Sequence, residues 1–165
     1  MLVEPILNIQ PFFEDAIIPK RAYPTDSGLD LYVYSFEKYY KGSIVTENIY
    51  AKEDTLILYP HERVLVNTGI SATVGKGYEI QIRPRSGLAL KSGITVCNTP
   101  GTIDESYRGI IGVILLNTSQ IQHKITKGDR IAQMVVAPVV LCEVKVVDDL
   151  KNTKRSSGGF GSTDI

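Results

Sequence analysis

Short runs of β-branched and aromatic residues recur along the chain and alternate with turn residues. These runs predict strands at Leu29–Tyr34, Leu56–Tyr59, Val64–Thr68, Tyr78–Arg83, Ile94–Cys97, Ile110–Leu116, Ile121–Ile125, Ile131–Val136 and Val139–Val147. Many short strands without helical periodicity between them favour an all-β sandwich or barrel over alternating β–α–β units. One short helix is expected from Gly87 to Lys91, opened by Ser86 and ended by Gly93.

Two stretches differ in composition from the strand-rich remainder. Ser35–Thr55 carries charged side chains among tyrosines, which is typical of either a long surface excursion or an extra hairpin. Residues 151–165 are rich in glycine, serine and threonine and contain almost nothing to bury, so we expect a mobile tail. The chain is therefore predicted to form a single β domain over 1–150, with a surface insert at about 35–55, followed by a tail over 151–165.

Composition and charge narrow the function classes. The chain has 165 residues and a mass of 18.2 kDa, which fits one domain. Lysine plus arginine (18) balance aspartate plus glutamate (18), so long-range attraction to nucleic acid or to an acidic membrane is not expected. The longest apolar run, Met134–Cys142, contains a proline and is too short to span a bilayer, and the N-terminus does not resemble a signal peptide. We expect a cytoplasmic protein, or one in the host compartment if its origin is viral or phage.

The cysteines and histidines offer little to metal or nucleophilic chemistry. Cys97 and Cys142 lie in apolar runs without metal-like spacing, which predicts two buried thiols in a reducing compartment. His61 and His123 are far apart in the sequence, and neither has a second ligand nearby. Histidine catalysis and a zinc site are therefore not expected.

The segment from Arg83 to Lys91 could hold an anion. A predicted strand ends in Arg83 and Arg85, and Ser86 and Gly87 follow at the start of the predicted helix. Unpaired N–H groups at a helix start attract anions, and an arginine can grip a phosphate through two parallel hydrogen bonds. The alternative is a solvated strand end with an ordinary N-cap, and the local pattern does not decide between the two.

The segment Asn98–Gly109 carries a second set of candidate groups. Asp104 follows an apolar residue and lies three positions before an aromatic one, so it could be a partly shielded carboxylate that orients a water molecule. Asn98 offers both donors and an acceptor, which is enough to read the edge of a base. The alternative is an Asx-type turn in which Asp104 caps its own backbone.

Three further segments carry polar residues of interest. In Gly128–Met134 we favour a plain turn with a surface ion pair between Asp129 and Arg130. In Thr25–Leu31, Asp30 lies between two leucines, which is unusual because an unpaired buried charge is costly. The strip from Arg155 to Thr163 could close over a phosphorylated, base-bearing ligand, although an inert tail is the simpler interpretation.

These five segments, taken in their order along the chain, resemble the motifs of the homotrimeric deoxyuridine triphosphatase (dUTPase) family. The matching stretches are Gly28-Leu29-Asp30-Leu31, Pro84-Arg85-Ser86-Gly87-Leu88, Asn98 with Gly101-Thr102-Ile103-Asp104 and Tyr107-Arg108-Gly109, Gly128-Asp129-Arg130-Ile131-Ala132-Gln133, and Arg155 with Gly158-Gly159-Phe160-Gly161-Ser162-Thr163. They cover nearly the whole chain. One such fragment would be a weak signal, whereas five in register are a strong one.

The resemblance implies an all-β, distorted jelly-roll (β-clip) subunit with one short helix, and a homotrimer whose three active sites are shared between subunits. It also implies hydrolysis of dUTP to dUMP and pyrophosphate with Mg²⁺ on the triphosphate. That reaction keeps uracil out of DNA and supplies dUMP for thymidylate synthesis.

The resemblance further implies a role for each matched residue. Asp104 activates the water that attacks the α-phosphorus, and Tyr107 packs on the deoxyribose so that a 2′-hydroxyl is excluded. Asp30 reaches the waters of the metal. The other implied substrate-binding residues are Asn98, Gly101, Thr102 and Ile103 at uracil, Arg85, Ser86, Gly87 and Gln133 at the phosphates, and Arg155, Phe160, Gly161, Ser162 and Thr163 in the closing tail.

The chain departs from the family pattern in a few places. Ser156 and Asp164 stand where the family often has glycine, and the Ser35–Thr55 insert is longer than the usual connection and could contact another protein. Two alternative functions stay open: a dCTP deaminase of similar fold, and a regulatory dUTPase-like protein that signals through the insert. The spacing of Asp104 and Tyr107 and the glycine-rich tail favour dUTP hydrolysis.

Overall fold

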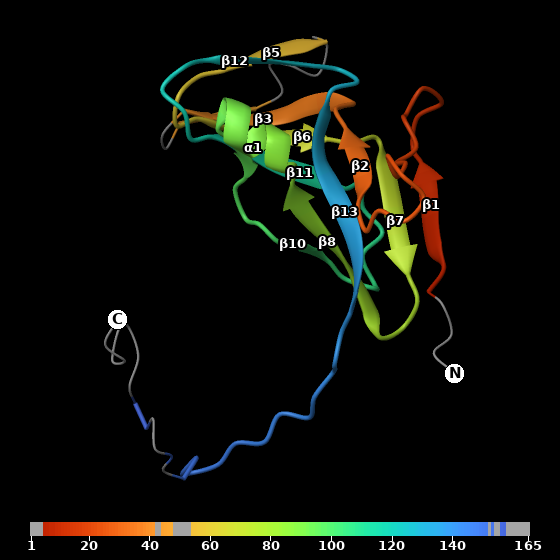
Figure 1. Cartoon of the computed structure of the whole chain (residues 1–165), viewed down its shortest axis with the longest axis vertical. Helices are drawn as coiled ribbons and strands as arrows, with labels where there is room; N and C mark the ends of the chain where they lie inside the picture. Colours follow the sequence, from red (N-terminus) through yellow and green to blue (C-terminus); the bar gives the residue numbers. More distant parts are fainter. Residues whose placement is uncertain (1–4, 42–43, 48–53, 152, 154–155, 158–165) are drawn as a thin grey trace.

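Short antiparallel strands and one short helix make up the described part of the chain (Figure 1). The computed structural model describes residues 5–41, 44–47, 54–151, 153 and 156–157. Its elements are β1 (Leu7–Pro11), β2 (Leu29–Tyr32), β3 (Ser35–Lys41), β4 (Ile44–Glu47), β5 (Thr55–Leu58), β6 (Arg63–Asn67), β7 (Ile70–Val74), β8 (Tyr78–Pro84), α1 (Ser86–Ser92), β9 (Ile94–Val96), β10 (Gly101–Ile103), β11 (Gly112–Asn117), β12 (His123–Thr126) and β13 (Arg130–Pro138).

A four-stranded and a five-stranded sheet form the body of the fold. The four-stranded sheet has the order β10-β8-β13-β2, and the five-stranded sheet has the order β4-β3-β6-β11-β9. Two smaller sheets, β1-β7 and β12-β5, complete the described fold. Buried positions alternate along β6 and β8, as expected for strands with one face toward a core.

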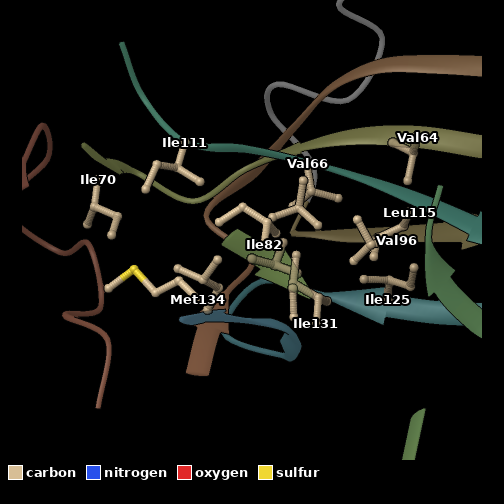
Figure 2. Packing of buried hydrophobic residues seen from close by; sticks show 14 of the residues in the cluster. Val64, Val66, Ile70, Ile82, Val96, Ile111, Leu115, Ile125, Ile131 and Met134 are labelled. Carbon is tan, nitrogen blue, oxygen red and sulfur yellow. The ribbon is translucent and has the colours of Figure 1, made fainter. Parts of the chain in front are cut away.

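The apolar core lies between these sheets. Val64, Val66 and Leu115 come from the five-stranded sheet and pack in one cluster with Ile82 and Met134 of the four-stranded sheet (Figure 2). All five side chains are almost completely buried. Burial of such aliphatic side chains is the main stabilising contribution in a fold of this kind. The predicted all-β class with one short helix is confirmed.

Helix α1 agrees with the predicted helix, apart from its cap. It begins at Ser86, and Arg85, not Ser86, occupies the N-cap position without a side-chain hydrogen bond. At the other end Gly93 has φ 64°, and its N–H donates to the carbonyl oxygen of Ala89. Glycine adopts this left-handed conformation at no steric cost, which explains the abrupt end of the helix. No described helix is both long and apolar enough to cross a membrane.

Gly93→Ala should destabilise the fold by about 1–3 kcal/mol. An alanine at this position would have to keep the positive φ of the backbone. Its Cβ would also lie 2.8 Å from Cβ of Ser119. Gly75→Ala is the matched control, because nothing lies within 4 Å of a Cβ there. Urea unfolding at a fixed protein concentration measures both variants. Equal losses in the two variants would contradict this account of Gly93.

The loop after β1 is fastened to the turn before β13. The Phe13 and Tyr34 rings stack at 4.3 Å with an interplanar angle of 7°, and Lys127 Nζ lies 4.4 Å from the Tyr34 ring centroid. Lys127 Nζ also lies 2.7 Å from Oδ2 of Asp15. The hydrogen bonds from Lys127 and Tyr34 lower the pKa of Asp15, and the bond to Asp15 raises the pKa of Lys127. These contacts hold in place the turn after which strand β13 begins at Arg130.

The predicted strand Val139–Val147 is wrong for the single chain. Strand β13 extends to Pro138, and the chain then leaves the body as an extended arm (Figure 1). Val140, Val144 and Val146 on this arm are 89%, 85% and 97% exposed. The apolar pattern is typical of a strand, but no described strand of the same chain pairs with it.

Other differences concern short or irregular segments. Strands β1, β7 and β10 were not predicted, and β11 and β12 are shifted by one or two residues relative to the predicted strands. Of the two alternatives for Ser35–Thr55, the structure shows the hairpin, with Lys41 opposite Ile44; residues 42–43 and 48–53 lie outside the described part.

The prediction of buried thiols is also wrong, because Cys97 and Cys142 are both exposed.

Candidate active site

The predicted second segment gathers around one pocket of about 360 Å³. Six of the predicted site residues line this pocket: Asn98, Gly101, Thr102, Ile103, Asp104 and Tyr107. Strand β10 forms one wall, held by its pairing with β8, in which Gly101 lies opposite Ile82. A Cβ at Gly101 would lie 3.2 Å from Nδ2 of Asn98, so the glycine lets the Asn98 amide lie close to the β10 backbone.

The lining of this pocket suits an uncharged ligand moiety. Its polar side-chain groups are the Asn98 amide, the carboxylates of Asp104 and of Glu37 on β3, and the hydroxyls of Thr102 and Tyr107, and aliphatic side chains form much of the rest. Among the described residues that line it there is no lysine or arginine. A few polar groups set in an apolar cavity are typical of a small-molecule site. The pocket therefore fits a base and sugar better than a string of phosphates.

Asp104 and Tyr107 stand at the two ends of one tight turn. The Tyr107 N–H donates to the Asp104 carbonyl oxygen at 3.1 Å, and the Tyr107 hydroxyl donates to the carbonyl oxygen of Ile110 at 3.0 Å. The Tyr107 ring folds over Gly109, where a Cβ would collide with it. The Asp104 side chain is exposed in the single chain and not partly shielded as the sequence suggested. An exposed carboxylate at a pocket rim can accept a hydrogen bond from a water molecule.

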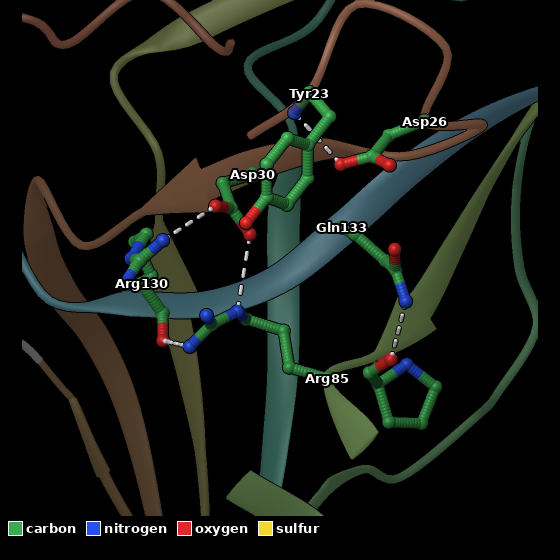
Figure 3. A network of polar contacts seen from close by, with 7 residues as sticks. Tyr23, Asp26, Asp30, Arg85, Arg130 and Gln133 are labelled. Carbon is green, nitrogen blue, oxygen red and sulfur yellow. Dashed lines mark hydrogen bonds and ion pairs between the residues drawn. The ribbon is translucent and has the colours of Figure 1, made fainter. Parts of the chain in front are cut away.

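A second group of predicted residues meets around Asp30 (Figure 3). Arg85 Nε donates to Oδ1 of Asp30 and Arg130 Nη1 donates to Oδ2, each at 3.0 Å. Arg85 Nη1 also donates to the carbonyl oxygen of Arg130 at 3.2 Å. The predicted ion pair between Asp129 and Arg130 is wrong, because Arg130 pairs with Asp30 and Asp129 accepts the Thr126 N–H at 2.7 Å. The half-buried charge of Asp30 is thus neutralised by two guanidinium groups.

Gln133 lies opposite Asp30 in the pairing of β13 with β2, and Ser86 and Gly87 follow Arg85 in the chain. Gln133 Nε2 donates to the carbonyl oxygen of Pro84 at 3.0 Å, and its side chain lies against Gly28, where a Cβ would collide with Oε1. Ser86 and Gly87 are exposed in the first turn of α1. A Cβ at Gly87 would meet nothing within 4 Å, so packing within the chain does not require glycine there. An open backbone at this point leaves room for a ligand.

The two groups lie in separate pockets of the single chain. Ile103, next to Asp104, lies opposite Ile80 near one end of β8, whereas Arg85 follows the other end of that strand. Arg85 lines a pocket with Arg130, and Asp30 and Gln133 line another. One described chain therefore does not bring Asp104 and Arg85 to the same pocket. Among the described residues, no group of three or more histidine, cysteine, aspartate or glutamate side chains could hold a metal ion.

The predicted tail residues lie outside the described part of the chain. These are Arg155, Phe160, Gly161, Ser162 and Thr163. Ser156 is described and has φ 45°, a left-handed conformation that favours glycine. This fits the glycine that the family often has at that position.

Comparison with known proteins decides the family. A family model described as dUTPase matches residues 48–164, which is most of the chain. The chain belongs to the dUTPase family. The segment around Asp30 precedes the stretch that the model matches, but relatives described below align with almost the full chain.

Two curated relatives carry the name deoxyuridine 5′-triphosphate nucleotidohydrolase. The protein from Hydrogenobaculum sp. is 48% identical over 157 residues, covering 95% of this chain and 96% of that protein. The protein from Gloeothece citriformis is 49% identical over 159 residues, covering 96% and 97%. The predicted family resemblance is confirmed.

Solved dUTPases share the fold. A dUTPase mutant of Staphylococcus bacteriophage 80alpha with dUpNHpp superposes with a TM-score of 0.73 at 23% identity, covering 95% of this chain and 97% of that one. A dUTPase mutant from phage phi11 of S. aureus, described with a structural Mg(II) ion, has a TM-score of 0.70 at 21% identity, covering 89% and 99%. At this level of identity the likeness supports the dUTPase fold.

Sequence reasoning missed two residues of these pockets. Arg130 was treated as part of a plain turn, although the odd position of Asp30 was a signal that a cation must lie nearby. Glu37 lies in the insert and had no local signal, because only the pairing of β3 with β6 brings it to the pocket. Its Oε1 accepts a hydrogen bond from Nδ2 of Asn67 at 2.6 Å.

Proposed function

We propose that the protein hydrolyses dUTP to dUMP and pyrophosphate. The observation that carries this proposal is the pocket that places the Asn98 amide, the Asp104 carboxylate and the Tyr107 ring around one cavity. A water held by Asp104 attacks the α-phosphorus and gives a proton to the carboxylate. The bond from the α-phosphorus to the bridging oxygen breaks, and that oxygen leaves with pyrophosphate. Such a displacement needs an oriented water and charge neutralisation more than a covalent nucleophile.

The pocket at β10 would hold the nucleoside. The Asn98 amide and the β10 backbone offer the donors and acceptors that complement O2, N3–H and O4 of uracil. Close packing around Gly101, Thr102 and Ile103 leaves no room for the 5-methyl group of thymine. The Tyr107 ring lies flat on the deoxyribose and excludes a 2′-hydroxyl. These roles explain why the pocket contains no cation among its described lining residues.

The residues around Asp30 would hold the triphosphate. Arg85 binds phosphate oxygens through its guanidinium group, and Ser86, the open backbone at Gly87 and the Gln133 amide add hydrogen bonds. Mg²⁺ bound to the triphosphate would neutralise part of its charge. Both oxygens of Asp30 already accept a guanidinium N–H, but a carboxylate has about four lone-pair sites, so Asp30 can still accept a hydrogen bond from a metal-bound water.

A homotrimer would join the two pockets into complete sites. In a symmetric ring, Asp104 of one copy can face Arg85 of the next copy. The separation of these two groups near opposite ends of β8 within one chain favours such an arrangement. The arm after β13 presents valines and leucines that would be buried on a neighbouring copy. The tail over 151–165 would close a site of the trimer. A cytoplasmic location stays a prediction.

Two inactive variants should restore activity to each other if the site is shared. Asp104→Asn and Arg85→Gln subunits, co-expressed in equal amounts, should give a trimer population with about one quarter of the parent activity, because about one quarter of interfaces pair an intact Asp104 with an intact Arg85. Each variant alone is the control. Activity of the mixture no higher than that of either variant would place both groups in one subunit's site.

Product identification tests the proposed reaction against deamination. Incubation with dUTP and Mg²⁺ should yield dUMP and pyrophosphate, and incubation with dCTP should release no ammonia. Ammonia from dCTP would make the protein a deaminase of similar fold. Binding of dUTP without any product would favour a nucleotide-dependent binding protein.

A further inference from the structure

The direction of the Asp104 side chain depends on the backbone of its turn. Within the described part of the chain, no side chain donates a hydrogen bond or an ion pair to the Asp104 carboxylate. The side chain is exposed, so packing restrains it little. A carboxylate that must aim a water at phosphorus needs a fixed position. The groups that fix the turn therefore determine where Asp104 points.

Two side chains hold the carbonyl groups of this turn. Arg108 Nη1 donates to the carbonyl oxygen of Glu105 at 2.6 Å and to that of Tyr107 at 2.8 Å. Thr73 Oγ1, on strand β7, donates to the same Glu105 oxygen at 3.0 Å. The Glu105 carbonyl thus uses both of its lone pairs. Arg108 links two carbonyl groups of the same turn. Thr73 joins this turn to the two-stranded sheet of β1 and β7.

We infer that Arg108 and Thr73 are positioning residues for dUTP hydrolysis, which act by fixing the Glu105–Ser106 peptide in the turn that Asp104 begins. The inference rests on the proposed function, because it assigns them a role through Asp104. Arg108 forms charge-assisted bonds, which are about twice as strong as neutral ones, so it contributes more than the Thr73 hydroxyl. Neither side chain lines the nucleoside pocket, so their loss should lower the rate of the chemical step much more than it weakens the affinity for the nucleotide.

Kinetics of matched variants test this role. Arg108→Met should lower kcat about 10- to 100-fold and Thr73→Val about 2- to 10-fold, with the KM for dUTP changed by less than about threefold in both. Thr73→Ser keeps the hydroxyl and should keep the parent kcat. Lys76→Met is the control for a lost surface charge, and Ser71→Ala is the control for a lost hydroxyl on β7. Both controls should be close to the parent.

The Asp104→Asn background separates positioning from general damage. Arg108→Met should cause no further loss of the residual rate in that background, because the group that it positions is already disabled. The double variant Thr73→Val with Arg108→Met should be little slower than Arg108→Met alone, since both hold one carbonyl. Thermal unfolding and the mass of the assembly confirm that each variant is folded.

Three results would overturn the inference. They are a parent-like kcat in Arg108→Met, a weakened affinity with unchanged kcat, and an equal further loss in the Asp104→Asn background. A failure of the proposed function is distinguishable, because the parent protein itself would then release no pyrophosphate from dUTP. A failure of the role given to Asp104 alone would show as a parent-like rate of dUTP hydrolysis in Asp104→Asn.

Discussion

Asp104→Asn should lower kcat for dUTP hydrolysis by about 10²- to 10⁴-fold, the range expected for loss of a general base. Asparagine has nearly the same shape as aspartate, but its amide cannot take the proton of the attacking water. The Asp104 side chain is exposed and bonded to no described residue, so the fold should be unaffected. The affinity for dUTP should stay close to that of the parent protein. Single-turnover kinetics and calorimetric titration with a nonhydrolysable dUTP analogue measure the two effects separately.

Glu105→Gln is the matched control for this substitution. Glu105 is the next residue, is also exposed and carries the same charge, but its side chain does not line the nucleoside pocket. It should keep a kcat within about threefold of the parent, as expected for a surface substitution. If both variants were equally impaired, local charge would matter more than the Asp104 base. If Asp104→Asn kept its activity, the base would lie elsewhere, and Glu37 in the same pocket would be the next candidate.

Deletion of Lys154–Ile165 should abolish turnover and leave the proposed homotrimer intact. The deleted segment contains the arginine, the aromatic ring and the hydroxyls that we expect to close over the bound nucleotide. Closure of a lid excludes water other than the attacking one and completes the charge neutralisation of the phosphates. The segment carries few apolar residues, so its removal takes little from the core. Steady-state kinetics and light scattering of the purified assembly measure the two properties.

A shorter deletion serves as the control for the tail. Removal of only Asp164 and Ile165 leaves Arg155 and Phe160 in place and should preserve most of the activity. Near-parent kcat in the longer deletion would show that the tail is not part of the working site. Dissociation of the trimer in that variant would assign the tail a role in assembly instead.

The sequence was sufficient for the fold class and for much of the nucleoside pocket. Alternation of apolar and polar residues marks β6 and β8 because both strands have one face on the core. The segment from Asn98 to Tyr107 was recognised as one unit because its candidate groups lie close together in the chain, and the fold keeps them in one pocket. Gly93 was recognised as a helix end because the left-handed position after a helix favours a residue without Cβ.

Long-range partners could not be predicted in the same way. The position of Asp30 between two leucines is unusual for an unpaired charge, but its partners Arg85 and Arg130 are 55 and 100 residues away in the sequence. Strands β1 and β7 are short, contain polar or small residues and are stabilised by pairing with each other across the chain. Local propensity carries no information on such pairings.

The arm after β13 shows a different limit. Its apolar pattern is typical of a strand, but a strand needs a partner, and the described chain offers none. Cys142 was expected to be buried for the same reason and is exposed on this arm. A second copy of the chain is the partner that the proposed trimer supplies.

Pyrophosphate release from dUTP, dTTP, dCTP and UTP, each with Mg²⁺, tests the central claim most directly. The account predicts rapid turnover of dUTP and rates at least about 10²-fold lower for the other three. The additional methyl group, the exchanged base edge and the additional hydroxyl each conflict with a group of the nucleoside pocket. Similar rates for all four nucleotides, or binding of dUTP without release of pyrophosphate, would contradict the account.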